Sequence, residues 1–191
     1  MQKIILASKS PRRKELMGLI PVNFEVITKE VEEVIDRCKT PEENVKMLAQ
    51  QKALAVAQDH EDRWVVGCDT IVVNKMEIMG KPKDVQGALN MLEDLQGGCH
   101  KVCTGVSLVN LKQGVSRSFT TTSLVYMRKL EAREIEWYVS TGEPMDKAGA
   151  YGIQGYASNF IEKIEGDYFN IVGLPVSVLY QVLKEYELIS F

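Results

Sequence analysis

Hydrophobic residues recur along the chain in two alternating patterns. Short runs rich in Ile, Val and Phe at Ile4–Ala7 and Phe24–Thr28 indicate strands, because β-branched and aromatic residues suit a pleated, buried surface. The stretch Trp64–Val73 is almost continuously apolar, which is typical of a central strand covered on both faces. Helical spacing is found between these strands, at Pro11–Met17 and from Pro41 to about Gln58. This alternation predicts an α/β fold.

Residues at the expected helix ends support these boundaries. Ser10 is a favourable N-cap before Pro11, and Thr40 with Glu43 has the spacing of a capping box. Asp84 is expected to cap a further helix, which ends near two consecutive glycines. The main helices therefore carry their own start signals.

The second half of the chain is predicted to continue in the same way. The expected elements are a short strand at Glu77–Met79, an antiparallel hairpin of His100–Leu111 with Ser116–Met127, a helix at Glu131–Ser140, a Gly-rich loop at Gly142–Tyr156, a hairpin over Phe160–Asn170 and a last helix from Pro175. No internal repeat, low-complexity tract or linker interrupts the pattern. We therefore expect one domain over residues 1–191 with a mixed sheet.

The composition limits which ligands the protein can bind and in which cellular compartment it is expected. A formal net charge of -3 gives the chain no general attraction for nucleic acid, so a polyanionic ligand must be held by a local cluster of Lys and Arg. The apolar run at the N-terminus is too short for a signal peptide, and no stretch reaches the ~18 apolar residues of a membrane helix. We expect a cytoplasmic protein with reduced cysteines and no membrane partner. The spacing of Cys99, His100 and Cys103 does not match a zinc site.

The segment Ser8-Lys9-Ser10-Pro11-Arg12-Arg13 joins the first strand to the first helix. Cations in the first turn oppose the helix macrodipole at a cost of ~0.3 to 1 kcal/mol each, and a bound anion removes that conflict. Free backbone N–H groups, a hydroxyl and two guanidinium groups are what a phosphate chain requires. The alternative is a surface helix with solvated arginines, and this segment alone favours neither.

Two charged residues are expected on buried surfaces. Lys52 lies near the middle of the apolar stripe of its helix, so it must meet a carboxylate, extend to solvent or face a polar cleft. Asp69 lies inside the apolar strand, where a carboxylate needs a cation, a metal or hydrogen bonds to stay ionised. Asp69 is the leading catalytic candidate, and a structural aspartate is the alternative.

Other candidate residues lie in loops. Glu32 and Glu33 form either an ordinary charged loop or magnesium ligands. Lys81 supplies a further cation in the tripeptide Gly-Lys-Pro. The segment Met145–Gly155 is rich in small residues that permit close approach of the backbone to a ligand, and Gln154 offers a donor and an acceptor. It matches neither the Walker-A nor the dinucleotide-binding pattern.

The motifs SxSPRR, GCDTIV, GKP and DKAGAYGIQG, in this order, resemble those of the Maf family of nucleotide pyrophosphatases, and AGAYGIQG resembles the subgroup that acts on dTTP and UTP. The resemblance implies an elongated mixed α/β fold like that of the inosine triphosphatases, with flanking helices and a deep cleft between two lobes. It also implies roles for residues at matching positions: Ser8, Ser10, Arg12, Arg13, Lys52 and Lys81 for phosphate binding, Asp69 as proton acceptor, Arg12, Thr70 and Gln154 for substrate selection, and Glu33 with Asp69 near a divalent metal.

The resemblance defines a mechanistic hypothesis and its rivals. Water attacks the α-phosphorus with Asp69 as proton acceptor, and Mg²⁺ or Mn²⁺ is the expected cofactor. A house-cleaning pyrophosphatase for altered purine nucleotides and a non-enzymatic nucleotide-binding regulator of septum formation are the alternatives. The expected partner is a nucleoside triphosphate rather than nucleic acid, and a homodimer is left open. Cys68 departs from the alanine more common in the motif, which suggests sensitivity to oxidation.

Overall fold

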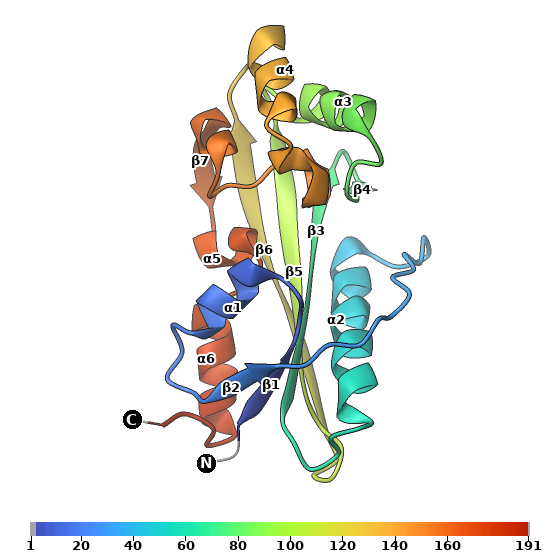
Figure 1. Ribbon diagram of the computed structural model, residues 1–191, viewed down its shortest axis with the longest axis vertical. Helices are drawn as coiled ribbons and strands as arrows, with labels where there is room; N and C mark the ends of the chain where they lie inside the picture. Colours follow the sequence, from blue (N-terminus) through green and yellow to red (C-terminus); the bar gives the residue numbers. More distant parts are fainter. Residues whose placement is uncertain (1–2, 191) are drawn as a thin grey trace. The chain divides into compact units, whose positions relative to one another are not determined.

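The computed structural model describes residues 3–190, and strands and helices alternate along most of the chain (Figure 1). The strands are β1 (Ile4–Ala7), β2 (Phe24–Val26), β3 (Val65–Asn74), β4 (Glu77–Met79), β5 (Cys99–Asn110), β6 (Val115–Met127) and β7 (Ile161–Glu165). The α-helices are α1 (Pro11–Met17), α2 (Pro41–Ala57), α3 (Val85–Leu95), α4 (Ala132–Ser140), α5 (Tyr168–Val172) and α6 (Val176–Glu185), and three 3₁₀ turns are η1 (Glu143–Asp146), η2 (Ala148–Ala150) and η3 (Tyr156–Phe160). The predicted α/β class is confirmed.

The strands form a seven-stranded mixed sheet. Its order is β2-β1-β3-β5-β6-β7, with β4 paired to β3 outside this path. Strand β1 pairs in parallel with β2 and β3, whereas β4 and β7 are antiparallel to β3 and β6. The mixed sheet with flanking helices agrees with the expectation from sequence.

The chain divides into two compact units. The first unit comprises the residues up to Asp69, Thr104–Thr121 and the residues from Gly173 onward. The second unit comprises Thr70–Cys103 and Thr122–Val172. Strands β3, β5 and β6 each contribute residues to both units, so each unit is built from segments distant in sequence.

In the first unit, glycines allow α2 to lie very close to the sheet. A Cβ on Gly67 of β3 would lie 2.2 Å from the Ala49 carbonyl oxygen and 2.7 Å from the Ala53 nitrogen. On Gly105 of β5 it would lie 2.3 Å from the Val45 carbonyl oxygen. Contacts below 3 Å are not tolerated between a side chain and backbone. Glycine at these two strand positions therefore fixes the distance and register of α2.

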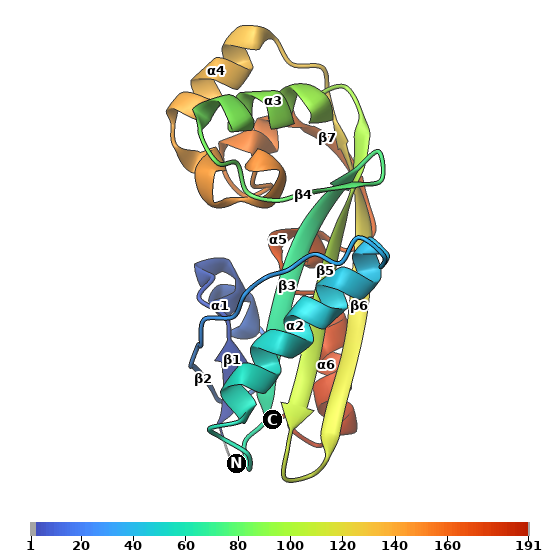
Figure 2. The same ribbon diagram turned by 90° about the vertical axis from the view of Figure 1, so that its right-hand side faces the viewer.

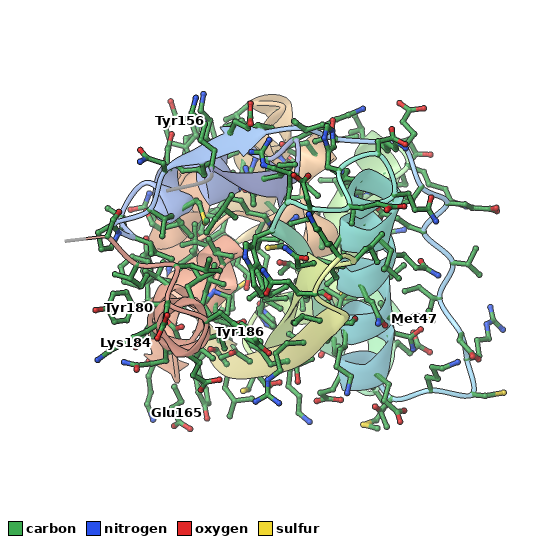
Figure 3. All side chains as sticks on the ribbon, turned by 90° about the horizontal axis from the view of Figure 1, so that it is seen from below. Met47, Tyr156, Glu165, Tyr180, Lys184 and Tyr186 are labelled. Carbon is green, nitrogen blue, oxygen red and sulfur yellow. The ribbon has the colours of Figure 1, made fainter. Side chains whose placement is uncertain are left out.

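The two longest helices of the first unit cover opposite faces of its strands. Helix α2 lies on one face and α6 on the other (Figure 1). Tyr180 and Lys184 lie on the outer side of α6 (Figure 3), whereas Leu179 and Leu183 of the same helix are fully buried. At the end of α6, Tyr186 packs against Trp64 with ring centroids 5.0 Å apart. The apolar face of α6 thus closes this side of the core.

The helix starts follow the sequence signals. Ser10 caps α1 with Pro11 as first helical residue, and Thr40 forms a reciprocal capping box with Glu43 at the start of α2. Asp84 accepts a hydrogen bond from the Gly87 nitrogen at 2.7 Å and so caps α3. These three predicted caps are confirmed. They were predictable because each cap depends on residues only a few positions apart.

In the second unit, α3 and α4 lie side by side over one face of the strands (Figure 2). Buried apolar residues from these helices meet residues of the strands and of the 3₁₀ turns in one core. His100 is buried in this unit, where its Nε2 lies 2.6 Å from the Tyr151 hydroxyl. Burial lowers the pKa of His100 to about 4, so the ring is neutral near pH 7.

The predicted hairpin over Phe160–Asn170 is wrong in its second half. Ile161–Glu165 is a strand, but Tyr168–Val172 forms α5. The Asp167 carboxylate accepts a hydrogen bond from the Phe169 nitrogen at 2.8 Å, which favours a helical turn. The turn signal at Glu165-Gly166 suggested a hairpin, and the tertiary contacts of Asn170 override that local preference.

Across residues 3–190, no α-helix combines the length and apolar composition that a bilayer-spanning segment requires.

Candidate functional site

The N-terminus of α1 collects hydroxyl and guanidinium groups. The Ser8 hydroxyl is buried and accepts hydrogen bonds from the Ser10 nitrogen and the Arg13 Nη1, both at 3.3 Å. The Ser10 hydroxyl accepts from the Arg13 nitrogen at 3.5 Å. Arg12 is partly exposed at the same helix start. The predicted anion-binding segment therefore folds as a helix N-terminus with its polar groups gathered in one place.

Arg13 lies at the start of α1 and also donates hydrogen bonds to two backbone carbonyl groups outside this helix. Its Nε donates to the Gly173 carbonyl at 2.8 Å, and its Nη1 donates to the Cys68 carbonyl at 3.0 Å. These bonds connect α1 to the middle of β3 and to the residues before α6. Arg13 therefore links three segments of the first unit next to Asp69, and the sequence did not suggest these contacts.

Lys52 is the cation at the centre of a carboxylate pair. Its Nζ lies 2.5 Å from Asp69 Oδ1 and 2.7 Å from Glu33 Oε1. The side chains of Lys52 and Asp69 are 15% and 9% exposed, whereas that of Glu33 is 55% exposed. Of the three expectations for Lys52, the structure shows the first, because the ammonium meets carboxylates.

The surroundings of Asp69 raise its proton affinity. Burial is the main cause, and it raises the pKa of Asp69 above the ordinary value, although the charges of Lys52 and Arg13 lower it in part. The nearby Glu33 charge also raises it. A carboxylate whose pKa is raised accepts a proton more readily than an exposed one, which suits a general base.

Asp69 and Glu33 supply carboxylate oxygens of the kind that a divalent cation binds. Both carboxylates converge on one positive group, the Lys52 ammonium. Among residues 3–190, no group of three or more His, Cys, Asp or Glu side chains gathers as a complete metal site. Mg²⁺ is usually held by one or two carboxylates together with phosphates and waters, so two carboxylates are sufficient protein ligands.

Cys68 does not have the environment of an oxidation-sensitive thiol. It is fully buried beside Asp69, and burial raises the pKa of its thiol to about 11. Reactivity requires an accessible thiolate, which this position disfavours. The expected sensitivity of Cys68 to oxidation is therefore corrected: it acts as a small apolar residue of β3.

The remaining predicted site residues belong to the second unit. Thr70 is half-buried in β3, and Lys81 is exposed just after β4. The Gly80 carbonyl, next to Lys81, accepts a hydrogen bond from the Gly149 nitrogen at 3.0 Å. The GKP motif and the start of the AGAYGIQG motif are thus brought together within this unit.

Gln154 is exposed on a tight turn of the AGAYGIQG motif. The Gly155 nitrogen donates to the Gly152 carbonyl at 3.1 Å, which places Ile153 and Gln154 at the centre of the turn. The nearby Glu143 carboxylate accepts hydrogen bonds from the Tyr138 hydroxyl of α4 and from the Tyr156 nitrogen just after the motif, and no sequence pattern pointed to this residue. Its position next to Pro144, two residues before the small-residue segment, is the signal that could have drawn attention to it.

Comparison with known proteins identifies the family. Residues 3–186 match the family described as Maf-like protein. The chain belongs to the Maf family. The resemblance inferred from four motifs is therefore confirmed over nearly the whole chain.

Two named proteins resemble this one over nearly the whole length of both chains. A protein from Bacillus cytotoxicus named dTTP/UTP pyrophosphatase is 48% identical over 187 residues, which cover 98% of this chain and 97% of the relative. A protein of the same name from Clostridioides difficile is also 48% identical, over 96% of this chain and 94% of the relative.

A solved structure shares the fold at low sequence identity. The structure of the Staphylococcus aureus Ham1 protein aligns with a TM-score of 0.53 at 14% identity, covering 97% of this chain and 100% of that protein. At this level of identity the likeness concerns the fold alone, and it supports the expected fold class.

Proposed function

We propose that this protein is a cytosolic nucleoside triphosphate pyrophosphatase that converts dTTP and UTP to the monophosphate and pyrophosphate. The observation that carries the proposal is the buried Asp69, paired with Lys52 and Glu33 in the unit that also contains the cation-rich start of α1. The two relatives named dTTP/UTP pyrophosphatase support the substrate class. In this proposal both units form one functional domain.

Asp69 is proposed to accept a proton from the attacking water. The water oxygen forms a bond to the α-phosphorus, and the bond from that phosphorus to the α–β bridging oxygen breaks. The bridging oxygen leaves as part of pyrophosphate, and the water proton passes to the carboxylate. Burial, which raises the pKa of Asp69, makes this carboxylate a stronger base than an exposed one.

Cations are proposed to neutralise the triphosphate and the departing pyrophosphate. Arg12 and the backbone at the start of α1 would bind phosphate oxygens together with Ser8 and Ser10, and Lys81 would add a further positive charge. Lys52 is expected to orient Asp69 and to offset charge that develops during transfer. Arg13 contributes charge while it holds α1 on β3.

Glu33 and Asp69 are the proposed protein ligands of a divalent cation. When bound, Mg²⁺ or Mn²⁺ would neutralise charge on the phosphate oxygens during bond cleavage. Because Glu33 is more than half exposed, it can move toward such an ion at little cost in burial.

Base selection is assigned to Gln154, with Thr70 and Arg12 as further contributors. An amide side chain can donate to O4 and accept from N3–H of uracil or thymine. Cytosine presents an N4 amino group instead, so it offers a different pattern to the same amide.

A nucleotide panel tests the proposal. With Mg²⁺ or Mn²⁺ present, we expect pyrophosphate release from dTTP and UTP at higher kcat/KM than from CTP, dATP or altered purine nucleotides such as ITP. Chelation of the metal with EDTA should remove the activity. A preference for ITP would replace the proposal with a purine house-cleaning enzyme, and saturable UTP binding without turnover would replace it with a binding protein.

A further inference from the structure

The turn that carries Gln154 is held at both ends by side chains outside it. At its start, the Gly152 nitrogen donates to the Tyr138 hydroxyl at 3.3 Å. Just after its end, the Tyr156 nitrogen donates to Glu143 Oε2 at 3.1 Å. Both partners come from α4 and the residues that follow it, so the turn is fixed by a separate element of the second unit.

Glu143 connects the two attachments. The Tyr138 hydroxyl donates to Glu143 Oε1 at 2.9 Å. The Glu143 carboxylate therefore binds both Tyr138, which holds the start of the turn, and the Tyr156 nitrogen, which follows its end. Tyr138 is fully buried, and burial and the hydrogen bond to Glu143 raise the pKa of its hydroxyl. The hydroxyl therefore stays protonated and continues to donate to the carboxylate.

The glycines of the turn pack tightly against Glu143 and Lys147. A Cβ on Gly155 would lie 2.2 Å from Glu143 Oε1, and on Gly152 it would lie 2.6 Å from Lys147 Cε. Lys147 in turn donates to the Glu143 carbonyl at 2.7 Å. The small residues of the motif thus let the turn approach protein groups, whereas their pattern in the sequence suggested close approach to a ligand.

Gln154 itself is exposed, so its direction depends on the backbone that carries it. The residue before the turn, Tyr151, is anchored in the core through His100 at 2.6 Å. Hydrogen bonds to a charged acceptor are stronger than neutral ones, and the Glu143 carboxylate accepts two of them here. A side chain that reads a base edge must be held in a defined geometry to discriminate between bases.

We infer that Glu143 is a positioning residue for nucleobase selection, which acts by holding the Gly152–Gly155 turn and with it the amide of Gln154. The inference rests on the proposed function, because it concerns the base that the pyrophosphatase prefers. Glu143 is assigned no contact with the nucleotide and no part in proton transfer.

Steady-state kinetics of three variants test this inference. In Glu143→Ala we expect KM for dTTP to rise about tenfold, the equivalent of ~1.4 kcal/mol, with kcat within about twofold. The KM for dATP should stay unchanged, so the preference for dTTP over dATP falls. Glu143→Gln should restore part of the preference, because its amide oxygen can accept from the Tyr156 nitrogen, whereas its amide nitrogen cannot accept from the Tyr138 hydroxyl. The control Glu162→Ala removes an exposed carboxylate of β7 and should match the wild type.

Amide hydrogen exchange of the peptide 151–157 gives a readout independent of activity. Exchange should accelerate in Glu143→Ala and also in Tyr138→Phe, which removes the hydroxyl and keeps the ring in the core. Wild-type exchange and an unchanged dTTP preference in both variants would overturn the inference. An equal loss of kcat/KM for dTTP and dATP would overturn it too, since it would indicate a general structural role. An inactive wild type would instead refute the proposed function itself.

Discussion

Replacement of Asp69 by Asn is expected to lower kcat for pyrophosphate release by ~10²- to 10⁴-fold, the usual contribution of a positioned general base. The amide has nearly the same shape but cannot accept the water proton. Burial already disfavours the ionised carboxylate, so the loss of its charge should not destabilise the fold. Lys52 retains Glu33 as an ion-pair partner in this variant. Thermal unfolding should therefore stay close to that of the wild type.

The measurement pairs turnover with binding. Pyrophosphate release from dTTP reports kcat, and titration with a non-hydrolysable α,β-imido analogue of UTP reports affinity. We expect affinity within a few-fold of the wild type. Asp94→Asn, which changes an exposed aspartate of α3, is the matched control for loss of one negative charge. Near-normal kcat in Asp69→Asn would remove Asp69 from the chemical step.

Replacement of Lys52 by Met is expected to lower kcat/KM by ~10²- to 10³-fold, which is the range by which kcat falls when one preorganised hydrogen-bond donor to developing charge is removed. Methionine fills a similar volume, but it leaves the Asp69 and Glu33 carboxylates without the cation that both contact. Without the Lys52 charge the pKa of the buried Asp69 rises further, so its carboxyl group holds a proton and no longer serves as a base, while Glu33 loses its ion-pair partner.

Lys46→Met supplies the control for this variant. Lys46 lies on the exposed side of the same helix α2, so it tests loss of a lysine without loss of the buried pair. We expect its kinetics with dTTP to match the wild type. Equal kcat/KM values in Lys52→Met and Lys46→Met would show that the ion pair only stabilises the fold.

Local structure could be predicted from sequence where it depends on neighbouring residues. The capping box of Thr40 and Glu43 and the buried strand that contains Asp69 were both expected and are found. In contrast, the start of α5 was predicted as the second strand of a hairpin, because the contacts of Asn170 with β5 and β6 are made to residues far away in sequence. A local sequence pattern cannot predict secondary structure that is determined by tertiary contacts.

The candidate site was predictable as a set of residues but not as a geometry. Helical spacing placed Lys52 on an inward face, yet its pairing with Asp69 depends on the register of α2 on β3. That register is set by the glycine at position 67, which admits the helix backbone. Glu143 lies outside the small-residue segment that drew attention, and its contacts with Tyr138 and Tyr156 become visible only in the fold. The roles of the site residues remain predictions for the variants described above.

The position of bond cleavage is the central claim, and hydrolysis in ¹⁸O-labelled water tests it most directly. Water that attacks the α-phosphorus leaves its oxygen in the monophosphate, whereas attack on the β-phosphorus leaves it in pyrophosphate. After turnover of dTTP, mass spectrometry of the two products identifies the labelled one. We predict one ¹⁸O atom in dTMP and none in pyrophosphate. Label in pyrophosphate, or release of orthophosphate, would contradict the proposed reaction.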